Sequence, residues 1–190
     1  PVVVPDYGLQ NKGKRYFFTD SIKLGVGEVF ISPLDLNIEG NAVELPWKPM
    51  IRLATPVHDS KGNKRGVVIL NYYGRDMLDR LRQIGAAHLR LTNAQGYWLL
   101  GPAPEDEYGF MFNRPDLTLG ARSPAVWDQV ARDSRGQFET EEGLWTYTEV
   151  RPLVLGAHTS QGSHEAFAPS RSRMESTAYV WKLVDFVPRA

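Results

Sequence analysis

Two arginines are the strongest candidates for polar recognition chemistry in this sequence. Arg15 precedes three aromatic residues, and Arg52 lies between Ile51 and Leu53 in a strand-like run. A guanidinium presents a planar fork of N–H donors that matches a carboxylate through two parallel hydrogen bonds. If Ile51 and Leu53 face a core, Arg52 points to the opposite face of its sheet. We therefore predict that both arginines hold an anionic ligand. The alternative for Arg52 is an ordinary ion pair with one of three acids: Asp35, Glu39 or Glu44.

The aromatic residues that follow Arg15 could line a pocket. Tyr16, Phe17 and Phe18 are consecutive in the sequence. Aromatic rings exclude water from ligand pockets and leave a few polar groups to orient the ligand. We predict a pocket role for Tyr16, whose hydroxyl can form a hydrogen bond, and for Phe18. The alternative is that the cluster packs in a core.

Two further groups of polar side chains lie at predicted strand ends. Ser32, Asp35 and Asn37 follow one strand, and Asn71 and Tyr73 end another on the same face. We predict that all five contact the ligand or hold the loop that does. Asp and Asn also commonly bond their own backbone in turns, so capping is the alternative for Asp35 and Asn37. A helix-entry cap and packing is the alternative for Asn71 and Tyr73.

The sequence gives little support to catalysis or to metal binding. It contains no Cys, which excludes disulfides and cysteine zinc sites. It has no Gly-x-Ser-x-Gly elbow, and Gly25 and Gly27 lack the rest of a phosphate-loop fingerprint. We predict no metal, no cofactor and no catalytic residue; a small hydrolase would need a nucleophile and a base in contact. The four histidines are too scattered for a metal site: His58, His88, His158 and His164.

The charge and the apolar composition limit the kinds of partner that the chain could bind. Lys plus Arg and Asp plus Glu each number 22, so the formal net charge is zero. Nucleic-acid-binding domains usually carry a basic excess, and we predict no nucleic-acid partner. No run approaches the ~18 apolar residues of a membrane span. Because no signal peptide opens the chain, we expect a fragment of a longer protein.

The first half of the chain predicts strands followed by a helix. In order, these are a strand at 29–32, a hairpin at 37–44, strands at 50–57 and 67–73, and a helix at 76–84. Gly40 and Asn41 suit a two-residue turn that needs positive φ. Met77, Leu78 and Leu81 share one face of the helix.

The pattern then restarts in the second half. Its predicted elements are strands at 88–92 and 97–100, a helix at 125–132, and strands at 144–150 and 178–187. Ser123 and Pro124 resemble an N-cap followed by proline at the first helical position. A Ser-, Gly- and His-rich loop is expected at 156–176. Antiparallel strands with segregated helices predict an α+β fold of two modules, 1–85 and 86–190, with the boundary near Gly85.

Several motifs, in this order, resemble a known family. The first half contributes residues 9–12, 15–18, 29–39, 44–46, 52–57 and 66–71, and the second contributes 96–99 and 108–111. The most specific is Ser-Pro-Leu-Asp-Leu-Asn-x-Glu at 32–39. Together they resemble double Cache (PDC, PAS-like) sensor domains of bacterial histidine kinases, diguanylate cyclases and chemoreceptors. The resemblance covers nearly the whole chain.

The resemblance implies two tandem PAS-like modules, each a central antiparallel sheet flanked by helices and loops. The distal module, 1–85, would bind a small polar metabolite, such as a carboxylate or an amino acid. The proximal module, 86–190, would pass the signal on. The chain would be a non-catalytic, periplasmic part of an inner-membrane receptor, a homodimer with its own transmembrane helices and a cytoplasmic kinase or cyclase output domain. The alternative is a structural or protein-interaction module without a small-molecule ligand.

Two features depart from the family pattern. The long N-terminal helix and the first strand of the distal module are missing, so we expect an incomplete first sheet. The loop at 156–176 is longer than the family pattern suggests. The closing segment, 181–188, resembles the last strand before a second transmembrane helix.

Overall fold

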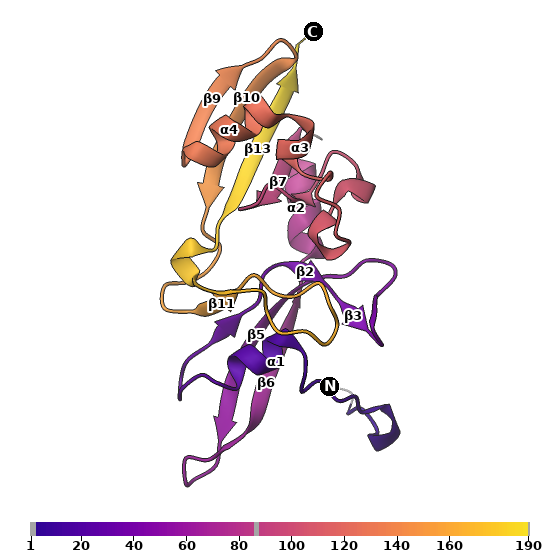
Figure 1. Ribbon diagram of the computed structural model, residues 1–190, viewed down its shortest axis with the longest axis vertical. Helices are drawn as coiled ribbons and strands as arrows, with labels where there is room; N and C mark the ends of the chain where they lie inside the picture. Colours follow the sequence, from indigo (N-terminus) through magenta and orange to yellow (C-terminus); the bar gives the residue numbers. More distant parts are fainter. Residues whose placement is uncertain (1–2, 86–87, 190) are drawn as a thin grey trace.

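Two mainly antiparallel sheets lie end to end along the long axis of the molecule (Figure 1). The computed structural model describes residues 3–85 and 88–189. The first sheet occupies the lower part of the view and the second sheet the upper part. The α+β class predicted from the sequence is confirmed. Ala86 and Ala87, at the predicted module boundary, lie outside the described residues, and the division into 1–85 and 86–190 stays a prediction.

The first sheet has six strands in the order β12-β11-β1-β5-β2, with β6 paired to β5. Their bounds are β1 Phe30–Ile31, β2 Asp35–Leu36, β5 Pro49–His58, β6 Lys64–Tyr73, β11 His158–Ser160 and β12 Arg173–Glu175. The long β5–β6 hairpin matches the two predicted strands. Its turn is stabilised by Asp59, whose Oδ1 accepts from the backbone N–H groups of Lys61 and Asn63, both at 2.9 Å.

A separate small hairpin follows β2. It consists of β3 Ile38–Glu39 and β4 Ala42–Val43. Gly40 and Asn41 both have positive φ, 55° and 85°, as a type I′ turn requires. The predicted hairpin turn is therefore confirmed.

Strands β11 and β12 come from the segment that was expected to be a loop. β1 pairs in parallel with β11, and β12 continues the sheet beyond it. The prediction of a loop over 156–176 is therefore wrong for the residues of these two short strands. They extend the first sheet at its β1 edge, although they belong to the sequence range assigned to the second module. Three-residue strands carry too little periodicity to be predicted from sequence.

The second sheet has five strands in the order β8-β7-β13-β10-β9. Their bounds are β7 Leu89–Asn93, β8 Trp98–Leu100, β9 Arg135–Glu139, β10 Gly143–Val150 and β13 Trp181–Pro188. β9 was not predicted, because its polar run, Arg-Gly-Gln-Phe-Glu, offers a single apolar side chain. It forms by pairing with β10, as Figure 1 shows at the outer edge of the sheet.

Short helices complete the two halves. The α-helices are α1 Tyr16–Ser21, α2 Arg75–Ile84, α3 Leu119–Arg122 and α4 Pro124–Arg132. The 3-10 turns are η1 Asp6–Gly8, η2 Pro104–Asp106, η3 Gly109–Met111 and η4 Ser176–Ala178. Pro124 begins α4 as predicted, but the Ser123 side chain makes no cap hydrogen bond. In the part of the chain that the structure describes, no helix has the length and apolar character needed to span a bilayer.

The hydrophobic core continues across the junction of the two halves. One buried cluster joins Leu34 and Leu78 from the first half to Leu91 and Leu99 from the second. A second cluster packs α4 against the second sheet, and a third packs α1 against the first. Each such side chain contributes roughly 1.5–3 kcal/mol when fully buried. The shared cluster therefore stabilises the packing of the two halves against each other.

Candidate ligand-binding site

Arg52 and Asp35 form a buried ion pair on the face of the first sheet that helix α1 covers. Arg52 Nη1 donates to Asp35 Oδ1 at 2.6 Å, and the two side chains are only 2% and 4% exposed. Arg52 Nη2 also donates to Asn37 Oδ1 at 3.0 Å. Burial disfavours the charged guanidinium, but the Asp35 carboxylate outweighs this and raises the pKa of Arg52. The ion pair named as the alternative for Arg52 is thus present, with Asp35 as partner.

The orientation of Arg52 follows from the sheet. Arg52 and Ala54 are buried, whereas Ile51 and Leu53 are half-buried on the opposite face. Ile51 packs against the core cluster that the two halves share, and Arg52 points to the opposite face of the sheet, as the strand alternation predicted. Helix α1 packs on β5 and covers the face that carries Arg52.

Tyr16 and Ser32 complete the network around Asp35. The Tyr16 hydroxyl donates to Asp35 Oδ2 at 2.5 Å. Ser32 Oγ accepts from the Arg52 backbone N–H and donates to the Pro33 carbonyl, both at 2.8 Å. Burial, reinforced by the Asp35 charge, raises the pKa of Tyr16 well above its usual range. The structure thus brings five of the predicted site residues together: Tyr16, Ser32, Asp35, Asn37 and Arg52.

Arg15 lies beside this network, and no carboxylate of the described residues pairs with it. It is 4% exposed, and its Nη1 donates to the Ile38 carbonyl at 2.8 Å. Its Nε is buried and has no hydrogen-bond partner. The Phe17 ring lies close to both guanidiniums, with its centroid 5.2 Å from Arg15 Cζ and 5.0 Å from Arg52 Cζ. Burial and then the charge of Arg52 lower the pKa of Arg15.

A cavity of about 510 Å³ opens next to Arg15. This volume lies within the range of small-molecule sites, roughly 300–1,000 Å³. Its lining contains three cations and no acid: the residues are Gln10, Asn11, Lys12, Lys14, Arg15, Gly40 and Phe167. Lys12 forms an ion pair with Glu39 at 2.9 Å, which leaves Lys14 and Arg15 as the positive charges that face the cavity without an acidic partner. Such a cavity suits an anionic ligand.

The other predicted residues lie outside this group. Phe18 is half-buried and packs against the cluster under α1. Asn71 is opposite Arg52 in the β5–β6 register but is exposed. The Tyr73 hydroxyl accepts from Arg75 Nε at 2.6 Å at the entry to α2, whose N-cap is Gly74 and which has no side-chain cap hydrogen bond among the described residues.

Sequence reasoning missed part of the cavity wall. Lys12 and Lys14 shortly precede Arg15 in the sequence, and this basic run indicates a binding site for an anion. Phe167 comes from the distant 156–176 segment, and no local pattern could have placed it there. Among the described residues, no three His, Asp or Glu side chains are arranged to hold a metal ion.

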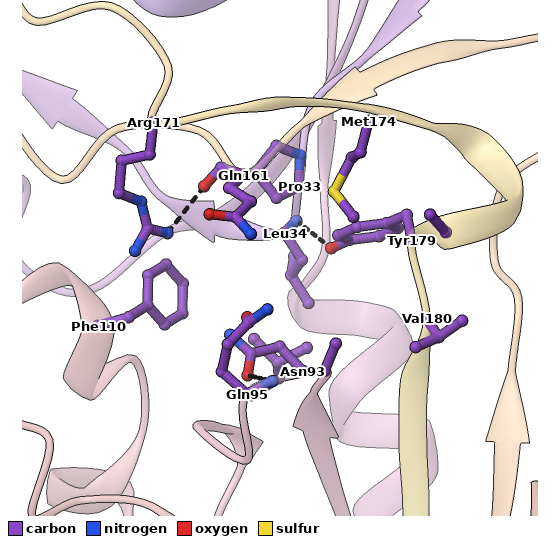
Figure 2. A pocket seen from close by; sticks show the side chains of 13 residues that line it. Pro33, Leu34, Asn93, Gln95, Phe110, Gln161, Arg171, Met174, Tyr179 and Val180 are labelled. Carbon is purple, nitrogen blue, oxygen red and sulfur yellow. Dashed lines mark hydrogen bonds between the residues drawn. The ribbon is translucent and has the colours of Figure 1, made fainter. Parts of the chain in front are cut away.

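A smaller cavity lies at the junction of the two halves, between Leu34 of the first half and Gln95 and Phe110 of the second (Figure 2). The Tyr179 hydroxyl there accepts from the backbone N–H of Leu34 and from Nε1 of Trp181, both at 3.0 Å. Burial raises the pKa of Tyr179 to about 12. The cavity volume is about 30 Å³, which is room for a water or two and not for a metabolite.

Several solved structures share this fold. The extracellular domain assigned to the histidine kinase vpHK1S-Z8 has a TM-score of 0.72 at 15% identity, over 94% of this chain and 57% of that one. A domain assigned to a sensory box/GGDEF family protein from Vibrio parahaemolyticus has a TM-score of 0.69 at 13% identity, over 100% and 62%.

A third structure contains a ligand. The ligand-binding domain of the Pseudomonas aeruginosa PAO1 amino acid chemoreceptor PctC, in complex with GABA, has a TM-score of 0.50 at 11% identity, over 98% of this chain and 66% of that one. The chain thus spans less than two thirds of each of these three structures. At such low identities the likeness establishes the fold alone.

Family membership rests on the sequence. No curated protein matches the chain. Residues 3–158, most of its length, match the family described as the bacterial histidine kinase sensor domain. The chain therefore belongs to the bacterial histidine kinase sensor domain family.

Proposed function

We propose that this sensor domain detects a small organic carboxylate, which binds in the cavity beside Arg15. The observation that carries the proposal is a buried guanidinium with no carboxylate partner, facing a cavity of ligand size. Two buried arginines, Arg15 and Arg52, share one carboxylate, Asp35, and Asp35 is bonded to Arg52. The site thus has an excess positive charge that an anionic ligand neutralises.

The energetic argument favours an anion over a neutral ligand. A buried charge without a partner costs several kcal/mol, and a bound carboxylate recovers this through charge-assisted hydrogen bonds. Lys14 adds a second cation at the cavity wall. GABA, the ligand of PctC, also carries a carboxylate. In this proposal Arg52, Asp35 and Tyr16 hold Arg15 and Phe17 in place and do not contact the ligand.

The binding signal has a path towards the second sheet. Arg15 donates to the carbonyl of Ile38, and the Ile38 side chain belongs to the core cluster that spans both halves. A ligand that pulls on Arg15 acts directly on this cluster. It shifts the equilibrium between two arrangements only as far as it binds one of them more tightly.

The finer features of the receptor belong to the same proposal. The chain acts as a non-catalytic, extracytoplasmic input domain. Its signal passes through transmembrane helices to a cytoplasmic kinase or diguanylate cyclase domain, in a homodimeric receptor. The family and the extracellular domain of vpHK1S-Z8 support this assignment.

The test is a thermal-shift screen of the chain against small carboxylates, with the matching amides as uncharged controls. A ligand at ~100 times its dissociation constant adds about 2.7 kcal/mol to the unfolding free energy. We expect a coherent carboxylate class to raise the melting temperature, and Arg15→Gln to abolish the shift. Arg65→Gln, on the exposed part of β6, is the matched control and should bind normally. Equal shifts in wild type and Arg15→Gln would reject the site.

A further inference from the structure

A second cavity lies on the first sheet and shares no lining residue with the cavity beside Arg15. Its volume is about 360 Å³. Helix α1, the β1 strand and the β11–β12 pair all contribute to it. The lining residues are Asp20, Leu24, Phe30, His158, Thr159, Arg173, Met174 and Glu175.

Asp20, in the last turn of α1, is a buried carboxylate that makes no hydrogen bond among the described residues. It is 5% exposed, and its Oδ2 is buried without a partner. The nearest cation is Arg173, whose Nε lies 3.6 Å from Asp20 Oδ1, beyond hydrogen-bond distance. Buried carboxylates are normally paired and hydrogen-bonded, because desolvation is otherwise costly.

The other lining groups do not meet this need. Thr159 Oγ1 donates to the Ile31 carbonyl at 2.6 Å. His158 Nε2 lies 3.3 Å from Glu28 Oε1, outside the lining. Arg173 is on the edge strand β12, and 53% of its side chain is exposed to solvent. The lining therefore contains two acids, Asp20 and Glu175, against one solvated arginine.

The rest of the wall is apolar. Leu24 and Phe30 are 7% and 1% exposed, and Met174 is half-buried. An acidic group beside an apolar wall matches a cation that carries a short hydrocarbon chain. An ammonium group offers N–H donors to a carboxylate, while its alkyl chain removes apolar surface from water.

We propose that this cavity binds a small organic ammonium ion, with Asp20 as the acceptor of its N–H groups. This goes beyond the carboxylate site, because the cavity is separate and its charge is opposite. The first half then carries two recognition sites, near the two ends of α1, for ligands of opposite charge. Arg173 competes with the ligand for Asp20, since both are cations.

The experiment titrates the chain at pH 7 with n-butylammonium chloride and follows backbone amide resonances. Butyrate and n-butanol have the same chain length with negative and zero charge. We expect saturable binding of n-butylammonium alone, with shifts around α1, β11 and β12. Asp20→Asn should weaken binding at least tenfold. Asp128→Asn, an exposed acid on α4, is the matched control and should bind like wild type.

Arg173→Gln keeps the proposal testable if Asp20→Asn does not fold. We expect Arg173→Gln to strengthen n-butylammonium binding several-fold, because the competing cation is gone. Arg15→Gln should leave it unchanged, which separates this site from the carboxylate site. Equal binding of n-butanol, unchanged binding in Asp20→Asn, or a loss of stability in Arg173→Gln without tighter binding would each overturn the proposal.

Discussion

Buried charged side chains differ in their ion-pair partners between the two halves of the molecule. In the second half, Asp106 pairs with Arg122 and Lys182 with Glu149, and Glu107 pairs across the junction with Arg82 of α2. In the first half, Asp35 pairs with Arg52, and Asp20 forms a longer ion pair with Arg173 at 3.6 Å, without a hydrogen bond. Arg15 has no acidic partner among the described residues, and its Nε makes no hydrogen bond.

This difference distinguishes buried charges that hold parts of the fold together from the buried charges that we propose to bind ligands. A paired buried charge holds elements together, as Lys182 does when it also donates to the Asp133 carbonyl at 2.8 Å. An unpaired buried charge reduces stability and remains available for a ligand. Arg15 and Asp20, which have no hydrogen-bonded counter-charge among the described residues, line cavities of ligand size, at 510 and 360 Å³. Both proposed binding sites thus lie near α1, one beside its N-cap Arg15 and the other beside Asp20 in its last turn.

The largest expected change in the unfolding free energy comes from breaking the buried Asp35–Arg52 pair of the first half. Asp35→Ala leaves Arg52 buried without a counter-ion and deprives Tyr16 of its acceptor. Breaking one partner of a buried pair costs about 3–5 kcal/mol. Urea unfolding should show a loss of this size. Asp116→Ala, which breaks an exposed pair with Arg114, is the control and should leave the unfolding midpoint unchanged. A small effect of Asp35→Ala would mean that the hydrogen bonds of Asp35 with Arg52 and Tyr16 add little to the unfolding free energy.

The apolar core of the second half should respond by a different mechanism. Leu119 is 2% exposed and packs with Val126 and Val130. Leu119→Ala creates a cavity and should reduce the unfolding free energy by about 3 kcal/mol. Carboxylate affinity, measured by calorimetry on the folded variant, should stay at the wild-type value. A changed affinity would show that the second half contributes to the site.

High pH should weaken the junction. The pKa of Tyr179 is about 12 in the folded protein, above its usual value of 10.0. Between these values the unfolded chain loses a proton that the folded chain keeps, so stability falls by about 1.4 kcal/mol per pH unit. The contribution of the Tyr179 hydroxyl to the unfolding free energy is fully present below pH 10. Tyr179→Phe should reduce this slope in urea unfolding at pH 9 to 12. An unchanged slope would exclude Tyr179 as its source.

The smallest expected effects concern the unpaired charges. Arg15→Gln and Asp20→Asn remove charges that have no charged hydrogen-bond partner. In the absence of ligand, neither should lower the unfolding free energy, since desolvation of the charge is relieved. Thermal unfolding of the two variants against wild type measures this. A loss comparable to that of Asp35→Ala would show that these charges are structural.

The sequence alone determined the elements that depend on local patterns. Strand alternation and a Gly40–Asn41 turn predicted the β5–β6 hairpin and the small hairpin before it. Apolar spacing predicted α2 and α4. The string at 32–39 and its companions led to the correct family of sensors. Each of these signals lies within a few consecutive residues, where periodicity and turn chemistry act.

Tertiary structure decided which of the predicted site residues are free to bind. Arg15 and Arg52 look equivalent in sequence, but Asp35 pairs with Arg52 and leaves Arg15 unpaired. Helix α1 is a short aromatic run, and it exists because its side chains pack on the first sheet. β11 and β12 join that sheet from more than a hundred residues away. Pairings at such separation depend on the whole fold, so no local pattern encodes them.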